Sequence, residues 1–327
     1  MRRREIVGVE NAEDIVRIPG SEWVITGAMS IGDVLRPRMF FVNVRTHKMR
    51  AAWPDKVVID LDRARFGDVE PPSAYSFHGL DVTMRGSAIE VLAVNHSPEH
   101  GPDAGKGRES VEFFEVDMAA DGPSLRWRGA ALGPSWLGGN DLTALPGGGF
   151  AITNFCYPGP EATMMGRAGG ICGNVLEWRS RDEGWSIVPG TDLNFPNGIA
   201  LAPDGQSYFV ASWGTKKVVR VPRPGSDVSR AEIPMEGMID NFTSTPDGAL
   251  LACVQVGDPA SLFARVEAGE KIECRFQAVR IDPATLETRI LVEDEVPDFF
   301  ATTVLQIGER EVWASAVIGN KLVAYDL

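Results

Sequence analysis

The chain has 327 residues, of which 32 are Lys or Arg and 45 are Asp or Glu, so the formal net charge is −13. This acidic balance argues against a nucleic-acid partner, because phosphate backbones are bound by concentrated positive charge. Hydrophobic residues at 44% and charged residues at 24% are ordinary for a globular protein and exclude a disordered or fibrous chain.

The first residues, MRRREIVGVENAEDIV, lack the apolar core of a signal peptide. No window of the chain approaches the ~18 consecutive apolar residues of a membrane span. The 4 cysteines have neither CxxC spacing nor the density of a disulfide-rich secreted domain. The sequence therefore predicts a cytoplasmic protein with free thiols and no membrane partner.

One sequence unit recurs six times along the chain. Each copy begins with a polar pair, continues as an apolar run, turns at Gly or Pro residues and ends in a second apolar run. The copies begin roughly 44 to 65 residues apart, which fits propeller blades of about 40–50 residues with loop insertions. In chain order the copies begin at Glu13-Asp14-Ile15, His78-Gly79-Leu80, Asn140-Asp141-Leu142, Asn197-Gly198-Ile199, Asp240-Asn241-Phe242 and Thr302-Thr303-Val304.

Further apolar runs follow these hairpins and predict outer strands, among them SVEFFEVD, GNVLEWRS, KKVVRVPR, FQAVRID and KLVAYDL. No stretch of about ten or more residues has a helical period. We therefore expect an all-β fold in which residues 1–327 form a single six-bladed β-propeller domain with four-stranded blades. The alternative is a β-sandwich with repeated hairpins, which six matched copies disfavour.

The first residues of the inner strands should meet at one end of the central tunnel. Four of the six copies carry two carboxylates and three amides at these positions, and none of these five side chains is a thiol or an imidazole. Oxygen ligands of this kind suit Ca²⁺, which takes 6–8 of them, better than Zn²⁺. The predicted ligands of this calcium are Glu13, Asn140, Asn197, Asp240 and Asn241.

A second layer stands one residue further along two of these strands, at Asp14 and Asp141. Adjacent strand residues point to opposite sides, so this layer cannot serve the same cage in the same way. A second calcium deeper in the tunnel, held by both carboxylates and a main-chain carbonyl, explains the pattern. The alternative is that Asn and Asp at strand starts only cap backbone turns, which does not explain their recurrence at matched positions.

Two histidines form a separate candidate group. His78 opens the second inner strand, and a turn centred on residues 86 and 87 would place it opposite Asn95 and next to His96. An imidazole is the natural general base near neutral pH, because its ordinary pKa is about 6.5. The alternative is a pair of loop-edge histidines with satisfied hydrogen bonds. The segments expected to roof this end of the tunnel are Ala28–Arg36, Ser97–Arg108, Phe155–Cys172, Gly257–Glu273 and Val317–Lys321.

These residues together resemble the serum paraoxonases, six-bladed calcium propellers within the wider gluconolactonase and senescence-marker group. The resemblance runs over most of the chain, and the ordered set ED, HG, NH, ND, NG, DN is its specific part. It is carried by GVENAEDI (8–15), FHGL (77–80), VNHSPE (94–99), VEFFEVD (111–117), NDLTALPGGGFAITN (140–154), FPNGIALAPDGQSYFVA (195–211), IDNFTSTPDG (239–248) and TTVLQIGEREVWASAVIGNKLVAYDL (302–327).

The resemblance implies a catalytic calcium on the five ligands named above and a structural calcium on Asp14, Asp141 and the main-chain carbonyl of Leu80. It implies that His78 activates water with the help of His96, and that the substrates are lactones and aryl esters. Three departures from the family stand out. No cysteine precedes Cys156 to close the ring by a disulfide, no apolar N-terminal anchor is present, and Phe155 stands where the family has an acidic residue.

The sequence thus favours a calcium-dependent lactone or ester hydrolase that acts on a small molecule. Calcium would polarise the substrate carbonyl, while His78, helped by His96, would deprotonate the attacking water. Three alternatives stay open: a sugar-lactonase-like enzyme with one divalent metal, a propeller that uses calcium only for stability, and a scaffold recruited to another reaction. The natural substrate and the oligomeric state are not determined by the sequence.

Overall fold

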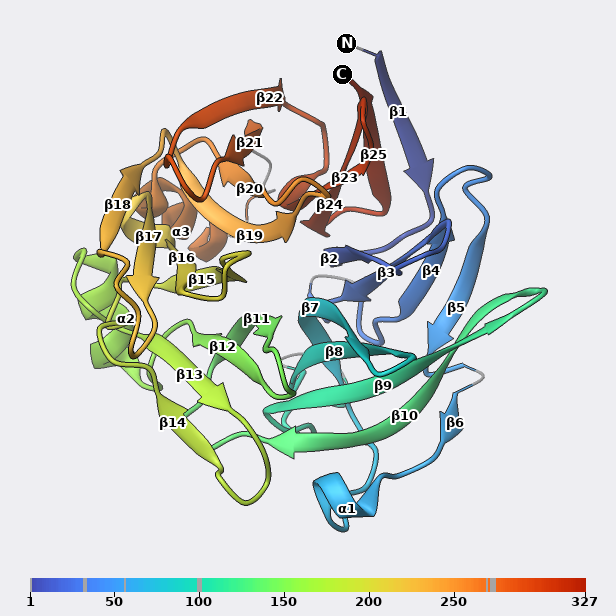
Figure 1. Ribbon diagram of the computed structural model, residues 1–327. Coiled ribbons are helices and arrows are strands. Elements are labelled where there is room, and N and C mark those ends of the chain that lie inside the picture. The colour runs from blue at the N-terminus through green and yellow to red at the C-terminus, as the bar shows by residue number, and fades with distance from the viewer. Residues whose placement is uncertain (1, 32–33, 56, 99–101, 269, 271–274) are drawn as a thin grey trace.

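The computed structural model describes residues 2–31, 34–55, 57–98, 102–268, 270 and 275–327. Its strands form six separate sheets, which stand like blades around a common axis (Figure 1). The predicted six-bladed β-propeller is therefore confirmed. Helices are short among the described residues: α1 (Arg63–Phe66), α2 (Pro160–Arg167), α3 (Pro259–Glu267) and the 3₁₀ turn η1 (Trp213–Thr215).

In each sheet the first strand of the repeat lies innermost and the following strands pair outward in antiparallel fashion. The first three sheets contain β2 (Ala12–Arg17), β3 (Trp23–Ala28), β4 (Met39–Asn43), β5 (Met49–Trp53); β7 (Ser76–Arg85), β8 (Ala88–His96), β9 (Ser110–Ala119), β10 (Gly122–Leu132); and β11 (Gly139–Ala144), β12 (Phe150–Asn154), β13 (Asn174–Trp178), β14 (Trp185–Ile187). The last three contain β15 (Pro196–Leu201), β16 (Ser207–Ser212), β17 (Lys217–Pro222), β18 (Ala231–Pro234); β19 (Met238–Ser244), β20 (Leu250–Gln255), β21 (Phe276–Ile281), β22 (Thr288–Asp294); and β23 (Phe300–Gly308), β24 (Glu311–Ile318), β25 (Lys321–Asp326).

Two details complete the blades. The short strand β6 (Val58–Ile59) adds to the second sheet by pairing in parallel with β10. The last sheet takes its outermost strand from the other end of the chain, because β1 (Arg2–Val7) pairs antiparallel with β25 from Arg2 opposite Asp326 to Val7 opposite Lys321. The two termini consequently lie side by side (Figure 1). Ring closure thus uses strand pairing, as expected from the absence of an N-terminal cysteine.

Apolar side chains fill the spaces between neighbouring blades, where they pack in several clusters. The closing strand takes part in this packing, since Ile6 is 4% exposed and lies in a cluster with Trp313 and Leu322. Among the described residues, Cys156, Cys172 and Cys253 form no disulfide. In the part of the chain that the structure describes, no helix is long and apolar enough to cross a membrane.

All six inner hairpins share one irregularity. The register of strand pairing shifts near the start of each innermost strand, at the residues that the repeat places there. A β-bulge of this kind adds a residue to one strand and changes the direction in which side chains point. The bulges therefore allow consecutive residues, such as Glu13 and Asp14, both to be buried near the axis.

Two glycines in these bulges permit close approach between blades. A Cβ on Gly79 would lie 2.4 Å from Oδ1 of Asp141 and 2.5 Å from its Cα, and a Cβ on Gly198 would lie 2.2 Å from the carbonyl oxygen of Asp240. Contacts under 3.0 Å leave no room for a side chain at either position. The HG and NG pairs of the repeat are thus explained by packing at the axis.

Candidate metal and histidine site

The five residues predicted to bind the first calcium come from the bulges of four different blades, and all are buried. Four of them have a buried side-chain oxygen without any protein hydrogen-bond partner: Oε2 of Glu13 and Oδ1 of Asn140, Asn197 and Asn241. A buried polar atom left unpaired costs about 1–3 kcal/mol. Unpaired oxygens on four matched positions are the donor set expected for a hard cation.

The remaining contacts hold these side chains in place. Nδ2 of Asn241 donates to Oε1 of Glu13 at 2.8 Å and to the hydroxyl of Thr303 at 3.1 Å. Nε2 of Gln255 donates to Oδ2 of Asp240 at 2.5 Å and to the carbonyl of Ala301 at 2.8 Å. These amide donors leave the amide oxygen of Asn241 and one carboxylate oxygen of Glu13 without a protein partner.

The carboxylates of this region are poorly stabilised by the protein alone. Burial, followed by the charges of Asp14 and Asp240, raises the pKa of Glu13 well above its usual value. Burial raises the pKa of Asp240 and of Asp141 in the same way, and that of Asp14 to about 6. Buried carboxylates this close need a cation or protons to compensate their charge.

The amides are an essential part of the set. Taken alone, the His, Cys, Asp and Glu side chains in the described ranges form no group of three or more that could hold a metal ion. The fit to calcium therefore rests on the combination of two carboxylates with three amide oxygens, which are ligands that calcium accepts and zinc disfavours.

The second layer is arranged differently. Both oxygens of Asp14 accept hydrogen bonds from protein groups: Oδ2 from the amide of Leu80 at 2.6 Å, and Oδ1 from the amide of Ile15 at 2.7 Å and the hydroxyl of Thr303 at 2.8 Å. Asp141 likewise accepts the amides of Leu142 and Ile199, each at 2.8 Å. Each carboxylate thus bridges its own strand to the next blade.

Asp81 on the second blade, which the sequence did not single out, makes the same bridge. It accepts the amides of Val82 and Ala144, each at 2.7 Å. The pattern recurs on three successive blades, so one function of these aspartates is to join blades through main-chain amides. A carboxylate oxygen has further lone pairs, and the predicted second calcium on Asp14, Asp141 and the Leu80 carbonyl stays a prediction.

The two histidines lie together, as predicted, but in a different register. Asn95 pairs with Phe77 and His96 with Ser76, because the bulge removes His78 from regular pairing. The expected position of His78 opposite Asn95 is therefore wrong by one residue. Nδ1 of His78 nevertheless lies 3.2 Å from Nε2 of His96, and Nε2 of His78 lies 3.4 Å from Oε1 of Glu13.

The environment of His78 favours an uncharged ring. Burial, and then the neighbouring His96, lowers the pKa of His78 well below its usual value. A hydrogen bond to the main chain of Gly139 acts in the other direction and raises this pKa, but by less. Beyond His96 stands Glu109, whose Oε2 lies 2.6 Å from Nδ1 of His96. The three side chains form a continuous row from the protein surface to the ligand cluster.

Glu109 and Gln255 are functional candidates that the sequence did not reveal. A signal for Gln255 was present, because second strands of the repeat end in polar residues opposite the bulges, as at Asn95, Asn154 and Ser212. Glu109 stands in no repeated position. Only the pairing of β8 with β9 brings it to His96.

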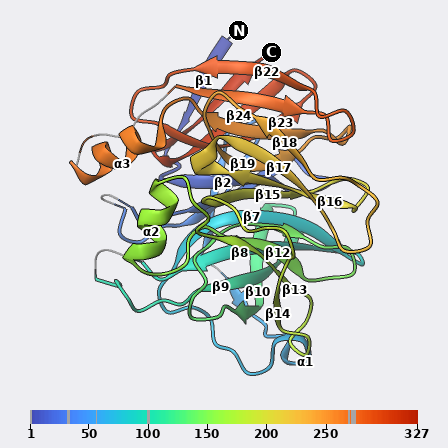
Figure 2. The same ribbon diagram turned by 90° about the vertical axis from the view of Figure 1, so that its left-hand side faces the viewer.

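Two of the expected roof segments contain helices. Helices α2 and α3 each follow the second strand of a blade, and Figure 2 shows both on the same face of the molecule. The strands that precede them end opposite the bulges, at Asn154 and Gln255, so both helices lie at the metal end of the tunnel. Parts of Ala28–Arg36, Ser97–Arg108 and Gly257–Glu273 lie outside the described residues.

The segment with α2 is held by several contacts. Nδ2 of Asn194 donates to the carbonyls of Gly166 and Gly170 at 2.7 and 2.6 Å. The buried rings of Phe195 and Trp213 pack with half-buried Phe155 and with Phe263 of α3. An apolar, aromatic wall therefore stands beside the blade that carries Asn197.

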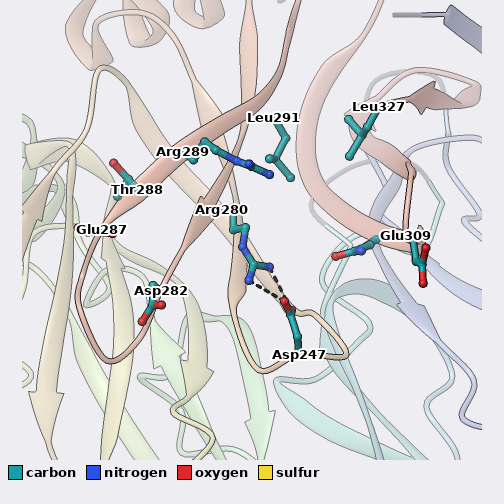
Figure 3. A pocket seen from close by; sticks show the side chains of 10 residues that line it. Asp247, Arg280, Asp282, Glu287, Thr288, Arg289, Leu291, Glu309 and Leu327 are labelled. Carbon is teal, nitrogen blue, oxygen red and sulfur yellow. Dashed lines mark hydrogen bonds and ion pairs between the residues drawn. The ribbon is translucent and has the colours of Figure 1, made fainter.

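A large pocket lies elsewhere on the molecule. It has a volume of about 620 Å³ and lies between the last two blades, where Arg280 forms a two-pronged ion pair with Asp247 at 2.8 and 3.1 Å (Figure 3). Asp247 belongs to the turn between β19 and β20, which is the end of the blade opposite Asp240. None of the predicted site residues lines this pocket.

Comparisons with known proteins agree on the fold. No protein-family model and no curated protein sequence matches the chain. Among solved structures, a luciferin-regenerating enzyme aligns with a TM-score of 0.59 at 12% identity, covering 100% of this chain and 95% of its own. A protein assigned as a gluconolactonase aligns with a TM-score of 0.55 at 15% identity, covering 99% and 91%. The calcium-binding protein regucalcin from Agrobacterium tumefaciens str. C58 aligns with a TM-score of 0.55 at 12% identity, covering 98% and 91%.

At these identities the likeness shows the architecture, which is the propeller of the gluconolactonase and regucalcin structures. The closer relation to paraoxonases that the motifs imply stays a prediction. Function therefore has to be argued from the site itself.

Proposed function

We propose that the protein is a calcium-dependent hydrolase of lactones or carboxylic esters. One observation carries the proposal: one imidazole of a histidine pair contacts a buried side chain of the set whose oxygens lack protein partners. Nε2 of His78 lies 3.4 Å from Glu13, and unpaired oxygens belong to Glu13, Asn140, Asn197 and Asn241. A general base beside a cation site is an arrangement that can catalyse the hydrolysis of a carbonyl compound.

In this proposal calcium is held by Glu13, Asn140, Asn197, Asp240 and Asn241. When bound, calcium supplies Lewis-acid polarisation of a substrate carbonyl oxygen. His78 takes a proton from the attacking water, and His96 orients its ring through the 3.2 Å contact. The water oxygen bonds to the carbonyl carbon, the ester C–O bond breaks, and the proton passes to the departing alcohol oxygen.

Three further points support this proposal. The paraoxonase-like motifs fall on the residues of the cluster, and the fold is shared with a gluconolactonase-assigned protein and a calcium-binding protein. The aromatic wall around Phe155, Phe195 and Trp213 suits an apolar acyl or aryl group. The acidic charge of the chain fits a small-molecule substrate better than a nucleic acid.

The test is a panel of lactones and aryl esters, assayed with calcium and with a chelator. We expect hydrolysis that requires calcium, and a loss of about 10²-fold or more in kcat for His78→Gln with calcium still bound. His47→Gln is the matched control, because His47 packs against Trp313, which lies on a different blade from His78. Retained turnover in His78→Gln would exclude His78 as the base. A calcium-stabilised protein without turnover on the whole panel would instead support a binding module.

A hydrolase with one ion rather than two is the second candidate. The observation in its favour is that the oxygens of Asp14 and Asp141 already accept main-chain amides, whereas the first layer has unpaired oxygens. Metal analysis after dialysis distinguishes the two. One calcium per chain supports the single-ion enzyme, and two support the predicted second layer with the Leu80 carbonyl.

A further inference from the structure

The row His78, His96 and Glu109 extends beyond the histidine pair that the motifs predict. Glu109 immediately precedes β9, and His96 ends β8; the pairing of Asn95 with Ser110 brings the two side chains together. Oε2 of Glu109 lies 2.6 Å from Nδ1 of His96. The side chains of His96 and Glu109 are 19% and 26% exposed, so the contact is partly shielded from water.

The carboxylate of Glu109 is itself held in place. Its Oε1 accepts a hydrogen bond from the main-chain amide of Ser97 at 3.4 Å. The main chain of Glu109 is also held, because the amide of Gly133 donates to the main-chain carbonyl of Glu109 at 2.9 Å. The adjacent Arg108 is bound to the buried Glu112 at 2.9 Å. Glu109 is thus oriented toward His96, while its cationic neighbour is engaged elsewhere.

We infer that Glu109 is a positioning residue that selects the protonated nitrogen of both imidazoles in the proposed hydrolase. An ionised carboxylate only accepts hydrogen bonds, so Nδ1 of a neutral His96 must carry its proton. Nε2 of His96 then carries a lone pair and accepts a hydrogen bond from Nδ1–H of His78 at 3.2 Å. Nε2 of His78, the nitrogen facing Glu13, is left as the proton acceptor.

The inference rests on the proposed function for its catalytic meaning, but the tautomers can be measured without turnover. The chain has only 4 histidines, so ¹⁵N-labelled imidazole spectra of the full-length, calcium-loaded protein can be assigned from single His→Gln variants. We expect His96 and His78 both to be protonated at Nδ1. A His96 protonated at Nε2 in the wild-type protein would overturn the inference.

Substitution of Glu109 then separates positioning from simple packing. Glu109→Leu removes the acceptor and should shift the His96 proton to Nε2, whereas Glu109→Gln keeps an acceptor oxygen and should retain part of the wild-type pattern. Glu115→Leu is the matched control in the strand that follows Glu109, since Glu115 lies 3.9 Å from Arg128 and its side chain is 35% exposed. An unchanged His96 tautomer in folded Glu109→Leu would refute the assignment.

Kinetics give the second readout. If the wild-type protein hydrolyses a lactone, Glu109→Leu should lower kcat about 10- to 100-fold with KM changed less than about threefold, and Glu109→Gln should fall between. Glu115→Leu should leave both constants unchanged. Hydrolysis with full kcat in Glu109→Leu would overturn the positioning role alone. A wild-type protein without turnover would refute the proposed function, and the tautomer spectra would still decide the role of Glu109.

Discussion

Without the proposed calcium, the stability of this protein should depend on pH in an unusual direction. A carboxyl with a higher pKa in the folded protein than in the unfolded chain binds more protons when folded, so its contribution to the free energy of unfolding falls as pH rises. Burial raises the pKa of Asp14 from 3.8 to about 6, and it raises those of Glu13, Asp141 and Asp240 well above their usual values.

The size of the effect follows from Asp14. The rise of its pKa corresponds to about 3 kcal/mol, lost between about pH 4 and pH 6. A change of 1 kcal/mol shifts the Tm by about 2–4 °C in chains of about 150–250 residues and by less in longer chains, so the Tm in EDTA should fall by several degrees. The other three carboxylates should extend the fall in Tm to higher pH. The proposed calcium would compensate the charges of its carboxylate ligands, so the fall in Tm should be smaller when calcium is present.

The assay is thermal unfolding followed by circular dichroism between pH 4.5 and pH 8, in EDTA and in excess calcium. Glu13→Gln removes one of the carboxyls with nearly unchanged shape, so it should weaken both the pH dependence in EDTA and the stabilisation by calcium. Glu115→Gln, on the exposed side of β9, is the control and should behave as wild type. A Tm in EDTA that is constant or rises from pH 5 to pH 8 would refute the reasoning.

Two further predictions concern ring closure and the thiols. Ile6→Ala in β1 should lower the free energy of unfolding by about 2–4 kcal/mol, because Ile6 is 4% exposed in the closing strand. The control Val7→Ala, at a residue 60% exposed, should change the free energy of unfolding by less than about 0.5 kcal/mol in denaturant titrations. Equal effects of the two substitutions would contradict closure by packing of β1. Burial raises the pKa of Cys172 to about 12, so this thiol should resist iodoacetamide at pH 8 in the native protein and react only in denaturant. Mass spectrometry of tryptic peptides would measure the labelling. Rapid labelling of Cys172 in the native protein would contradict its burial.

Much of the architecture could be predicted from the repeat. Six polar pairs ahead of alternating apolar runs predicted where the inner strands begin. The observed strands begin within a few residues of Glu13, Asn140 and Asn197. The same repetition singled out the five first-layer residues, and each of them is buried. Periodicity also indicated correctly that no long helix interrupts the described blades.

The repeat could not determine how the polar pairs are used. A register shift of one residue, caused by the bulge in each inner hairpin, decides that Phe77 rather than His78 faces Asn95. Bulges are compatible with the same alternating sequence, since they depend on how neighbouring blades approach at Gly79 and Gly198. Sequence spacing alone therefore located the histidines near each other without giving their geometry.

The number of blades, the positions of the oxygen-bearing side chains at the strand starts and the histidine pair could all be predicted from the order of the residues. The folded chain was needed to show that first-layer oxygens are unpaired, that Asp14 and Asp141 join blades, and that Glu109 reaches His96. Whether a polar atom has a partner depends on strands from other blades and on the loops between them, and those contacts leave no periodic trace in the chain.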